Sequence, residues 1–364
     1  MNNIDQLLTV ILVIRDRPFY TDRWMHYANA TRFPFNILIA DGGNDLFVQN
    51  KLENQVHYPH LKYNYIRYPY DVSTKEYFCK IADALEKTKT PYVVLADDDD
   101  FWNIDGLRAS ILFLEKNSDY ATCRGRNFAF TQTQKNQLKI HFDPHTIFDI
   151  SDTLPTDRVM KIYPILGGTF YDVHRTENYT KIFKQVADIN MHFLPLCETM
   201  ISLMDAAMGK IKRLEIPYLL RECGHNQSTS QQDHLSRLIF GPIHENLLAI
   251  CHAIANEIAL NQSIDIPAFE LKLKNEFVKQ IAPRLSNHLY AYHQISFSEI
   301  MRDFKTWLIH NIERKYTRTG KNTRLLTNWL HRKKIKKKFK AYQRKNEEPI
   351  FQEIDQFLAQ YENR

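Results

Sequence analysis

The sequence predicts an α/β protein with a mostly parallel β-sheet covered by helices on both faces, followed by a helical C-terminal region. Two observations lead to this prediction. Four short apolar runs punctuate the first hundred residues, and stretches with helical periodicity separate them. Such alternation is typical of a parallel sheet, and nearly continuous apolar strands are typical of a sheet buried on both faces. From about residue 234 strand-like runs fade, and helical periodicity dominates to the end.

The expected elements follow from these patterns in chain order. Strands are predicted at Leu8–Ile14, Phe35–Ala40, Leu61–Tyr68, Tyr92–Ala96 and Lys212–Leu220, with a hairpin of Arg126–Thr133 and Leu138–Phe142. Helices are predicted at Thr74–Lys87, Ile104–Lys116, Thr176–Asp188 and Leu196–Met208. The first of these helices is the clearest, because its apolar residues recur every three or four positions and Ser73 or Thr74 can cap its start. We expect one domain over residues 1–230, with halves 1–103 and 104–230, and a helical region over 231–364.

The composition is that of a folded protein in a reducing compartment. The chain is 44% hydrophobic and 25% charged, which is unlike a disordered segment. Its five cysteines are scattered and form no CxxC pair, so we expect free thiols. The apolar run Leu7–Ile14 is too short to span a bilayer and has no basic flank or cleavage site. We therefore expect a cytoplasmic protein.

The positive charge of the chain is concentrated in one segment. The net charge is +6, but residues 314–345 carry 14 Lys or Arg and no acid, so the remainder has 34 basic and 42 acidic residues, a net of −8. Ile335, Phe339 and Tyr342 lie at helical spacing within it. A basic helix with a few large apolar residues suits an anionic membrane surface. A solvated helix face and a nucleic-acid site are the alternatives, and no nucleic-acid-binding module is recognisable.

Four consecutive aspartates, Asp97–Asp100, directly follow the fourth predicted strand. Their mutual repulsion would destabilise the fold unless a cation or a proton intervened. Because alternate residues of an extended chain point the same way, we expect Asp97 and Asp99 to face one site, and Asp98 and Asp100 to face the opposite side of the chain. The alternative is a solvated acidic turn, or caps for the next helix. Ligands bind beyond the carboxyl ends of parallel strands, and this favours a Mg²⁺ or Mn²⁺ site.

Three segments together resemble the GT-A fold glycosyltransferases, and specifically the large inverting family of bacterial polysaccharide-forming enzymes. They are TVILVIRDRP, ILIADGGND and TPYVVLADDDDFW, which follow one another at about 30 and then about 55 residues. The last resembles the strand with the Asp-x-Asp motif. The resemblance covers about the first 225 residues, and it implies that 1–103 bind a nucleotide-sugar donor and that 104–230 bind the acceptor.

The resemblance also implies roles for residues near the donor. Asp41 would bind the nucleotide base, while Asp97 and Asp98 would also be donor-binding residues. Lys80 and Arg15 could reach its diphosphate as positive charges. Ordinary explanations stand beside these roles: Asp41 precedes two glycines and could be a turn residue, and a lysine or arginine is most often a surface residue.

Two further residues are placed by the same resemblance. Glu198 matches the catalytic carboxylate within Leu-Cys-Glu-Thr-Met, although Thr199 replaces the usual second acid. The helix dipole would also favour a glutamate there without any catalytic role. His225 occupies the place of a third metal ligand, which would favour Mn²⁺ over Mg²⁺. It could equally be an ordinary surface or hydrogen-bonded histidine.

The sequence therefore predicts a glycosyltransferase that depends on Mn²⁺ or Mg²⁺, held by Asp97 and Asp99 with His225 as a candidate third ligand. It would transfer a sugar, with inversion, to a hydroxyl of a glycan or lipid-linked acceptor in bacterial surface polysaccharide synthesis. The basic segment would bring it to the inner face of the cytoplasmic membrane. One alternative is a nucleotidyltransferase that makes an activated sugar, but the loop after the first strand has no glycine. The other is an inactive scaffold at a membrane.

Overall fold

The computed structural model of the chain describes residues 3–132, 138–142, 149–162, 168–191, 193–223, 243–277 and 349–361. The chain divides into two compact units, one formed by residues 1–274 with 350–364 and the other by residues 275–349. The basic segment 314–345 and the expected domain boundary near residue 230 lie outside the described residues. None of the helices in the described part is long and apolar enough to cross a membrane.

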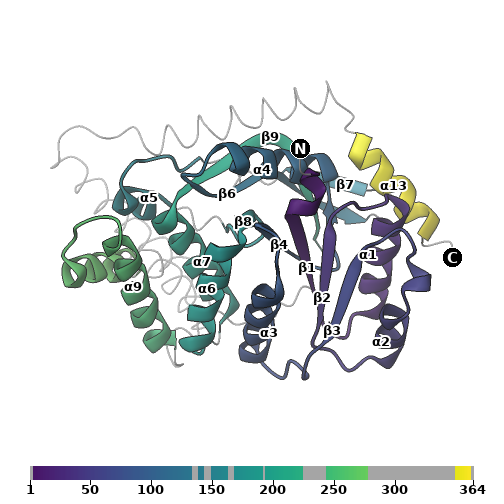
Figure 1. The fold of residues 1–364 in the computed structure, drawn as a ribbon, viewed down its shortest axis with the longest axis horizontal. Coiled ribbons are helices and arrows are strands. Elements are labelled where there is room, and N and C mark those ends of the chain that lie inside the picture. The colour runs from purple at the N-terminus through teal and green to yellow at the C-terminus, as the bar shows by residue number, and fades with distance from the viewer. Residues whose placement is uncertain are drawn as a thin grey trace, which may run out of the picture. The chain divides into compact units, whose positions relative to one another are not determined.

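The first unit is built on one mixed sheet with the strand order β3-β2-β1-β4-β8-β6-β9-β5, and β7 pairs with β6 (Figure 1). Its first half is parallel and consists of β1 (Leu8–Ile14), β2 (Asn36–Asp41), β3 (Tyr63–Arg67) and β4 (Tyr92–Ala96). Every residue of β1 and of β4 is buried, as their continuous apolar runs predicted. Ile14 pairs with Asp41, and Asp41 with Arg67, so these strands end at one edge of the sheet.

Helices cover both faces of these parallel strands. Alternate residues of β1, from Leu8 to Ile14, share a core with α1 (Pro18–Ala30), α2 (Leu46–Glu53) and α4 (Ile104–Lys116). The residues between them point to the opposite face, where α3 (Thr74–Lys87) and α6 (Thr176–Asp188) pack together. Ser73 caps α3 as expected, accepting a hydrogen bond from the backbone N–H of Lys75 at 3.1 Å.

The second half of the sheet is mostly antiparallel. It contains β5 (Phe101–Trp102), β6 (Tyr120–Gln132), β7 (Leu138–Phe142), β8 (Val173–Arg175) and β9 (Lys210–Glu222). β6 and β7 form the predicted hairpin, and β6 also pairs in parallel with β9. The helices here are α5 (Pro155–Ile162) and α7 (Leu194–Met208), with α9 (Ile243–Ala259) packed on α7. Sequence patterns did not identify α1, α5 or β8.

The last described helix, α13 (Pro349–Tyr361), belongs to the same unit as the sheet. Figure 1 shows it beside α1, although the two helices come from opposite ends of the sequence. Two short 3₁₀ helices, Ile4–Leu7 and Gln55–His57, complete the regular elements of the first hundred residues.

Candidate active site

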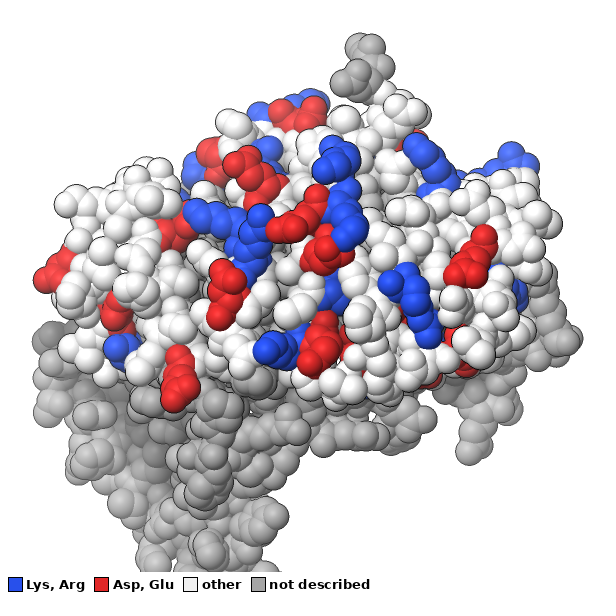
Figure 2. Space-filling model, turned by 60° about the horizontal axis from the view of Figure 1, so that its bottom comes forward, with Lys and Arg blue, Asp and Glu red and all other residues white. Residues whose placement is uncertain are grey.

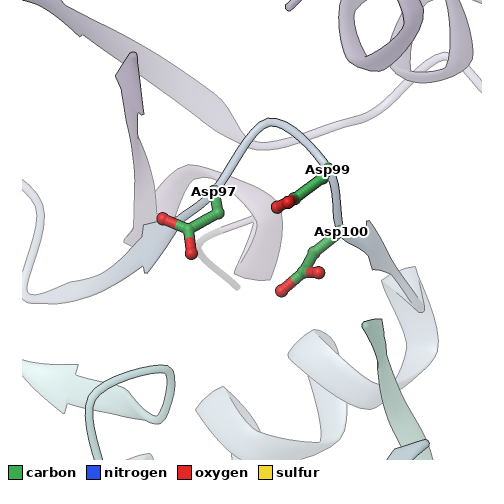
Figure 3. A group of neighbouring side chains, drawn as sticks. All are labelled: Asp97, Asp99 and Asp100. Carbon is green, nitrogen blue, oxygen red and sulfur yellow. The ribbon is translucent and has the colours of Figure 1, made fainter. Parts of the chain in front are cut away.

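The candidate site lies where β1, β2 and β4 end, because these parallel strands bring their carboxyl ends to the same edge. Asp97–Asp100 directly follow β4 and connect it to β5. Carboxylate oxygens of Asp97, Asp99 and Asp100 lie within 4.8 Å of one another. Figure 3 shows the three carboxyl groups around a common space. We call these three residues the carboxylate cluster.

One part of the sequence prediction for the aspartates is wrong. Asp97 and Asp99 share a site and Asp98 points elsewhere, as expected, but Asp100 joins the first pair instead of facing away with Asp98. The alternation rule assumes an extended chain, and the chain turns at Asp98 and Asp99 before it enters β5. This turn rotates Asp100 back toward Asp97.

Asp97, Asp98 and Asp100 are costly to ionise in the folded protein. Burial raises the pKa of Asp97, and the neighbouring charge of Asp99 adds to the effect. Burial also raises the pKa of Asp98 to about 7 and that of Asp100 well above its ordinary value. Oδ2 of Asp100 is buried and accepts no hydrogen bond from the described residues, although Nε of Arg221 is 3.4 Å away. Such an orphaned oxygen is unusual in a folded protein.

Helix α1 holds the turn from one side. Arg17, just before this helix, pairs with Asp98 at 2.9 Å and with Asp99 at 2.7 Å. The hydroxyl of Thr21 donates to Asp98 at 2.9 Å. The buried guanidinium of Arg23 donates to the backbone oxygen of Asp99 at 3.3 Å. Two residues of α1 and the residue that precedes the helix therefore fix the position of this turn.

A second group of side chains closes the site from the other half of the sheet. The hydroxyl of Tyr171 donates to Asp97, and the guanidinium of Arg221 lies 4.9 Å from the centre of the Tyr171 ring. Arg221 comes from the end of β9 and also faces Asp100. Glu198 lies in the second turn of α7, which begins at Leu194 and has Pro195 in its first turn.

Glu198 is the most isolated carboxylate of the site. Burial raises its pKa to about 7, with the charge of Asp97 adding to this and that of Arg221 opposing it. These electrostatic partners place it beside the carboxylate cluster. Its carboxylate accepts no hydrogen bond from the described residues, whereas its backbone oxygen accepts one from Ser202 at 2.9 Å. A carboxyl group with a pKa near neutrality can exchange a proton with a bound hydroxyl.

The expected donor residues lie at the same edge, but they contact one another. Asp41 is buried, and its carboxylate accepts hydrogen bonds from Tyr65 at 2.6 Å, from Arg67 at 2.5 Å and from the backbone N–H of Gly43 at 2.8 Å. Its pairing with Arg67 follows from their adjacent positions at the ends of β2 and β3. Asp41, the last residue of β2, is thus well paired by neighbouring side chains and by the loop that follows the strand.

Lys80 and Arg15 are both tied to Asp71. The ammonium of Lys80 is buried against the Asp71 carboxylate and donates to the backbone oxygen of Ile14 at 3.2 Å. Arg15 is exposed and donates to the backbone oxygen of Asp71 at 2.9 Å. Gly42 permits this arrangement, since a Cβ there would overlap the Asp71 carboxyl group. Asp71, on the loop after β3, was not identified from the sequence.

Sequence reasoning did not assign Arg17, Tyr77, Tyr171 or Arg221 to the cluster. Tyr77 on α3 has its pKa raised by burial and by the charges of Asp97, Cys197 and Glu198, so it lies within electrostatic range of the cluster and of α7. Of the four, only Arg17 carries a signal, its position next to the end of β1. His225 lies outside the described residues, so its expected role as a ligand is untested.

The cluster fits a hard divalent cation. Its ligand atoms are three carboxylate oxygens, which are the donors that Mg²⁺ and Mn²⁺ prefer, and one buried oxygen, Oδ2 of Asp100, accepts no hydrogen bond from the described residues. Figure 2 shows one face of the molecule, on which basic and acidic side chains are interspersed and do not gather into a patch of one sign. The described part of this face therefore shows no broad electrostatic attraction for an anion.

Comparison with known proteins establishes the fold. No protein-family model and no curated protein sequence matches the chain. Among solved structures, the chain is similar to S. aureus TarS 1–349 in complex with UDP-GlcNAc, with 14% identity, a TM-score of 0.52, and coverage of 80% of this chain and 77% of that one. It also matches S. aureus TarS with 14% identity and a TM-score of 0.46, covering 80% of this chain and 46% of that one. The GT-A-like α/β fold expected from the sequence is confirmed.

Proposed function

We propose that this protein is a glycosyltransferase of the family that its motifs resemble. It would move a sugar from a nucleotide-diphosphate sugar to a hydroxyl of a glycan or lipid-linked acceptor, with inversion, in the synthesis of a bacterial surface polysaccharide. The proposal rests chiefly on one observation: a three-carboxylate cluster, with a buried oxygen that accepts no hydrogen bond from the described residues, lies near Glu198, a glutamate whose pKa is about 7.

Glu198 is the proposed general base. The acceptor oxygen attacks the anomeric carbon of the donor while its proton passes to the Glu198 carboxylate, and the bond from that carbon to the diphosphate oxygen breaks. The electron pair leaves with the diphosphate. Because the base and the leaving group are on opposite sides of the reacting carbon, the configuration inverts. A positioned base of this kind contributes about 10²–10⁴-fold in rate.

Asp97, Asp99 and Asp100 are the proposed metal ligands, with His225 as a further candidate. A divalent cation there, Mn²⁺ or Mg²⁺, would neutralise the negative charge that develops on the leaving diphosphate. Tyr171 holds the Asp97 carboxylate in place through its hydroxyl, and Arg17 holds that of Asp99.

A nucleotide sugar is supported as the donor by the fold neighbour, because TarS 1–349 has been solved in complex with UDP-GlcNAc. Asp41, Asp98, Arg15 and Lys80 stay as proposed donor-binding residues. For Lys80 this requires its ammonium to reach the diphosphate from its present place beside Asp71. The basic segment 314–345 is proposed to bind an anionic membrane surface that carries a lipid-linked acceptor.

The test is the thermal stability of the full chain with Mn²⁺ and a set of nucleoside diphosphates. We expect a nucleoside diphosphate to raise the unfolding temperature only when Mn²⁺ is present, since ligands that bind the native state stabilise it by mass action. Asp99→Asn should abolish this effect. Asp105→Asn is the matched control. It makes the same chemical change outside the cluster, at a side chain on α4 that is 76% exposed.

Two outcomes would contradict the proposal. If Asp99→Asn responds to Mn²⁺ and nucleoside diphosphate as the wild type does, the cluster is not the metal site. If the wild type binds both ligands but neither hydrolyses nor transfers the sugar of any nucleotide sugar, the protein is a binding scaffold and not an enzyme.

A further inference from the structure

The C-terminal helix α13 has one apolar face, and this face is covered by the first unit. Ile350, Ile354, Phe357, Leu358 and Tyr361 recur at helical spacing, and Ile354 and Leu358 are 0% and 1% exposed. The helix follows residues 275–349, which form the other compact unit. The chain thus returns to the sheet domain after 75 residues, with its last described element.

The partner of this helix is α1. The hydroxyl of Tyr361 donates to Asp22 at 2.7 Å, and the hydroxyl of Tyr27 donates to Glu353 at 3.3 Å. The ring of Phe357 lies 5.2 Å from that of Tyr27, edge to face. Figure 1 shows the two helices side by side. Aromatic pairs of this geometry are typically worth about 0.5–1.5 kcal/mol beyond the area that they bury.

The same contacts continue to Phe101, the residue that directly follows the carboxylate cluster. Its ring is 4.8 Å from Tyr27 and 6.3 Å from Phe357, again edge to face. The guanidinium of Arg23 lies 5.2 Å from the Phe101 ring and also donates to the backbone oxygen of Asp99. Phe101 is therefore fixed by α1 and by α13 together.

Helix α1 stands between α13 and the aspartates. Its residues Asp22 and Tyr27 contact α13, while Thr21, together with Arg17 at its N-terminal end, holds Asp98 and Asp99. A movement of α1 away from the sheet would shift these aspartates. Metal ligands must be held to within about 0.5 Å to bind well, so the position of α1 sets how well the cluster can bind a cation.

We propose that α13 is a clasp that sets the cation affinity of the carboxylate cluster by fixing α1 and Phe101. This proposal depends on the proposed function only in taking the cluster as a cation site. Phe357 and Tyr361 are then positioning residues, which act on the site through α1 and Phe101.

The experiment measures two quantities on the full-length protein. The first is the dissociation constant for Mn²⁺ alone, titrated at a temperature where every variant is folded. The second is the unfolding temperature without metal. Phe357→Ala removes the ring that packs against both Tyr27 and Phe101, and Tyr361→Phe removes only the hydroxyl that binds Asp22. Gln360→Ala, on the exposed side of α13, is the control.

We expect Phe357→Ala to raise the Mn²⁺ dissociation constant about tenfold and Tyr361→Phe about threefold, which are typical sizes for coupling through direct contacts. Gln360→Ala should leave it unchanged. A helix that only stabilises the fold would lower the unfolding temperature in Phe357→Ala without changing the affinity of the folded protein, and this result would overturn the proposal. If Phe357→Ala does not fold, Tyr361→Phe carries the test, and an unchanged affinity there has the same meaning. A wild type that does not bind Mn²⁺ would instead refute the proposed function, and the clasp with it.

Discussion

Replacement of Glu198 by glutamine should separate activity from stability. Glutamine has nearly the same shape as glutamate, but it cannot accept the acceptor proton. We therefore expect Glu198→Gln to lose about 10²–10⁴-fold in the rate of transfer. The same change should stabilise the metal-free protein at alkaline pH, because the wild type keeps a buried negative charge beside Asp97.

The size and direction of this stabilisation follow from the pKa. Burial raises the pKa of Glu198 from 4.5 to about 7. A difference of about 2.5 units corresponds to about 3 kcal/mol, at about 1.4 kcal/mol per unit. The native state binds the proton more tightly than the unfolded state, so the free energy of unfolding falls as pH rises from 4.5 to 7. Glu198→Gln should gain up to about 3 kcal/mol at pH 8 and nothing at pH 4.

Urea denaturation between pH 4 and pH 8 measures this gain, with EDTA present to keep metal away. Glu177→Gln is the control, because Glu177 is exposed in the first turn of α6. The difference in unfolding free energy between Glu198→Gln and wild type should grow through this range and level off above pH 7. A difference that does not change with pH would refute the burial argument. Transfer by Glu198→Gln at the wild-type rate would refute its role as base.

Three further changes test the buried network by urea denaturation. Lys80→Met leaves the Asp71 carboxylate buried without its cation and should cost about 3–5 kcal/mol, and a loss under 1 kcal/mol would show that water reaches this pair. Gly106→Ala places a methyl group against a backbone carbonyl of β9 and should cost about 1–3 kcal/mol. Burial opposes the protonation of His174, but the Asp205 carboxylate outweighs it and raises the pKa of His174. This stabilisation is fully present below about pH 6.5 and is lost as pH rises through the raised pKa, so Asp205→Asn should destabilise the protein more at pH 6 than at pH 9.

The strands of the first hundred residues could be predicted because burial on both faces leaves a clear signal. β1 and β4 have the residues that their apolar runs predicted, while β2 starts and ends one residue later. Helix α1 gave no such signal. It buries Thr21 and Arg23 as well as Trp24 and Met25, because it contacts the sheet, the aspartates and α13 on different sides. A helix with polar partners on one side has no simple apolar stripe.

The site could be predicted only where its residues directly follow strands. Asp97–Asp100 follow β4, and their position alone indicated a ligand site. Tyr171 and Arg221 come from segments 74 and 121 residues beyond Asp97 and Asp100, and only the pairing of β4, β8, β6 and β9 brings them close. No local pattern encodes such a contact. The packing of α13 against α1 could not be predicted from the sequence for the same reason.

The charges of the site explain why a cation and an anionic donor should bind together. Asp97–Asp100 and Glu198 are five carboxyl groups, and two arginines, Arg17 and Arg221, face them. With every group ionised, three negative charges would be left, and the raised pKa values show that the fold resists this state. A diphosphate alone would add to the repulsion, whereas a divalent cation removes most of it. Nucleoside diphosphate should therefore bind weakly without metal and much more tightly with it, because each ligand lowers the electrostatic cost of the other.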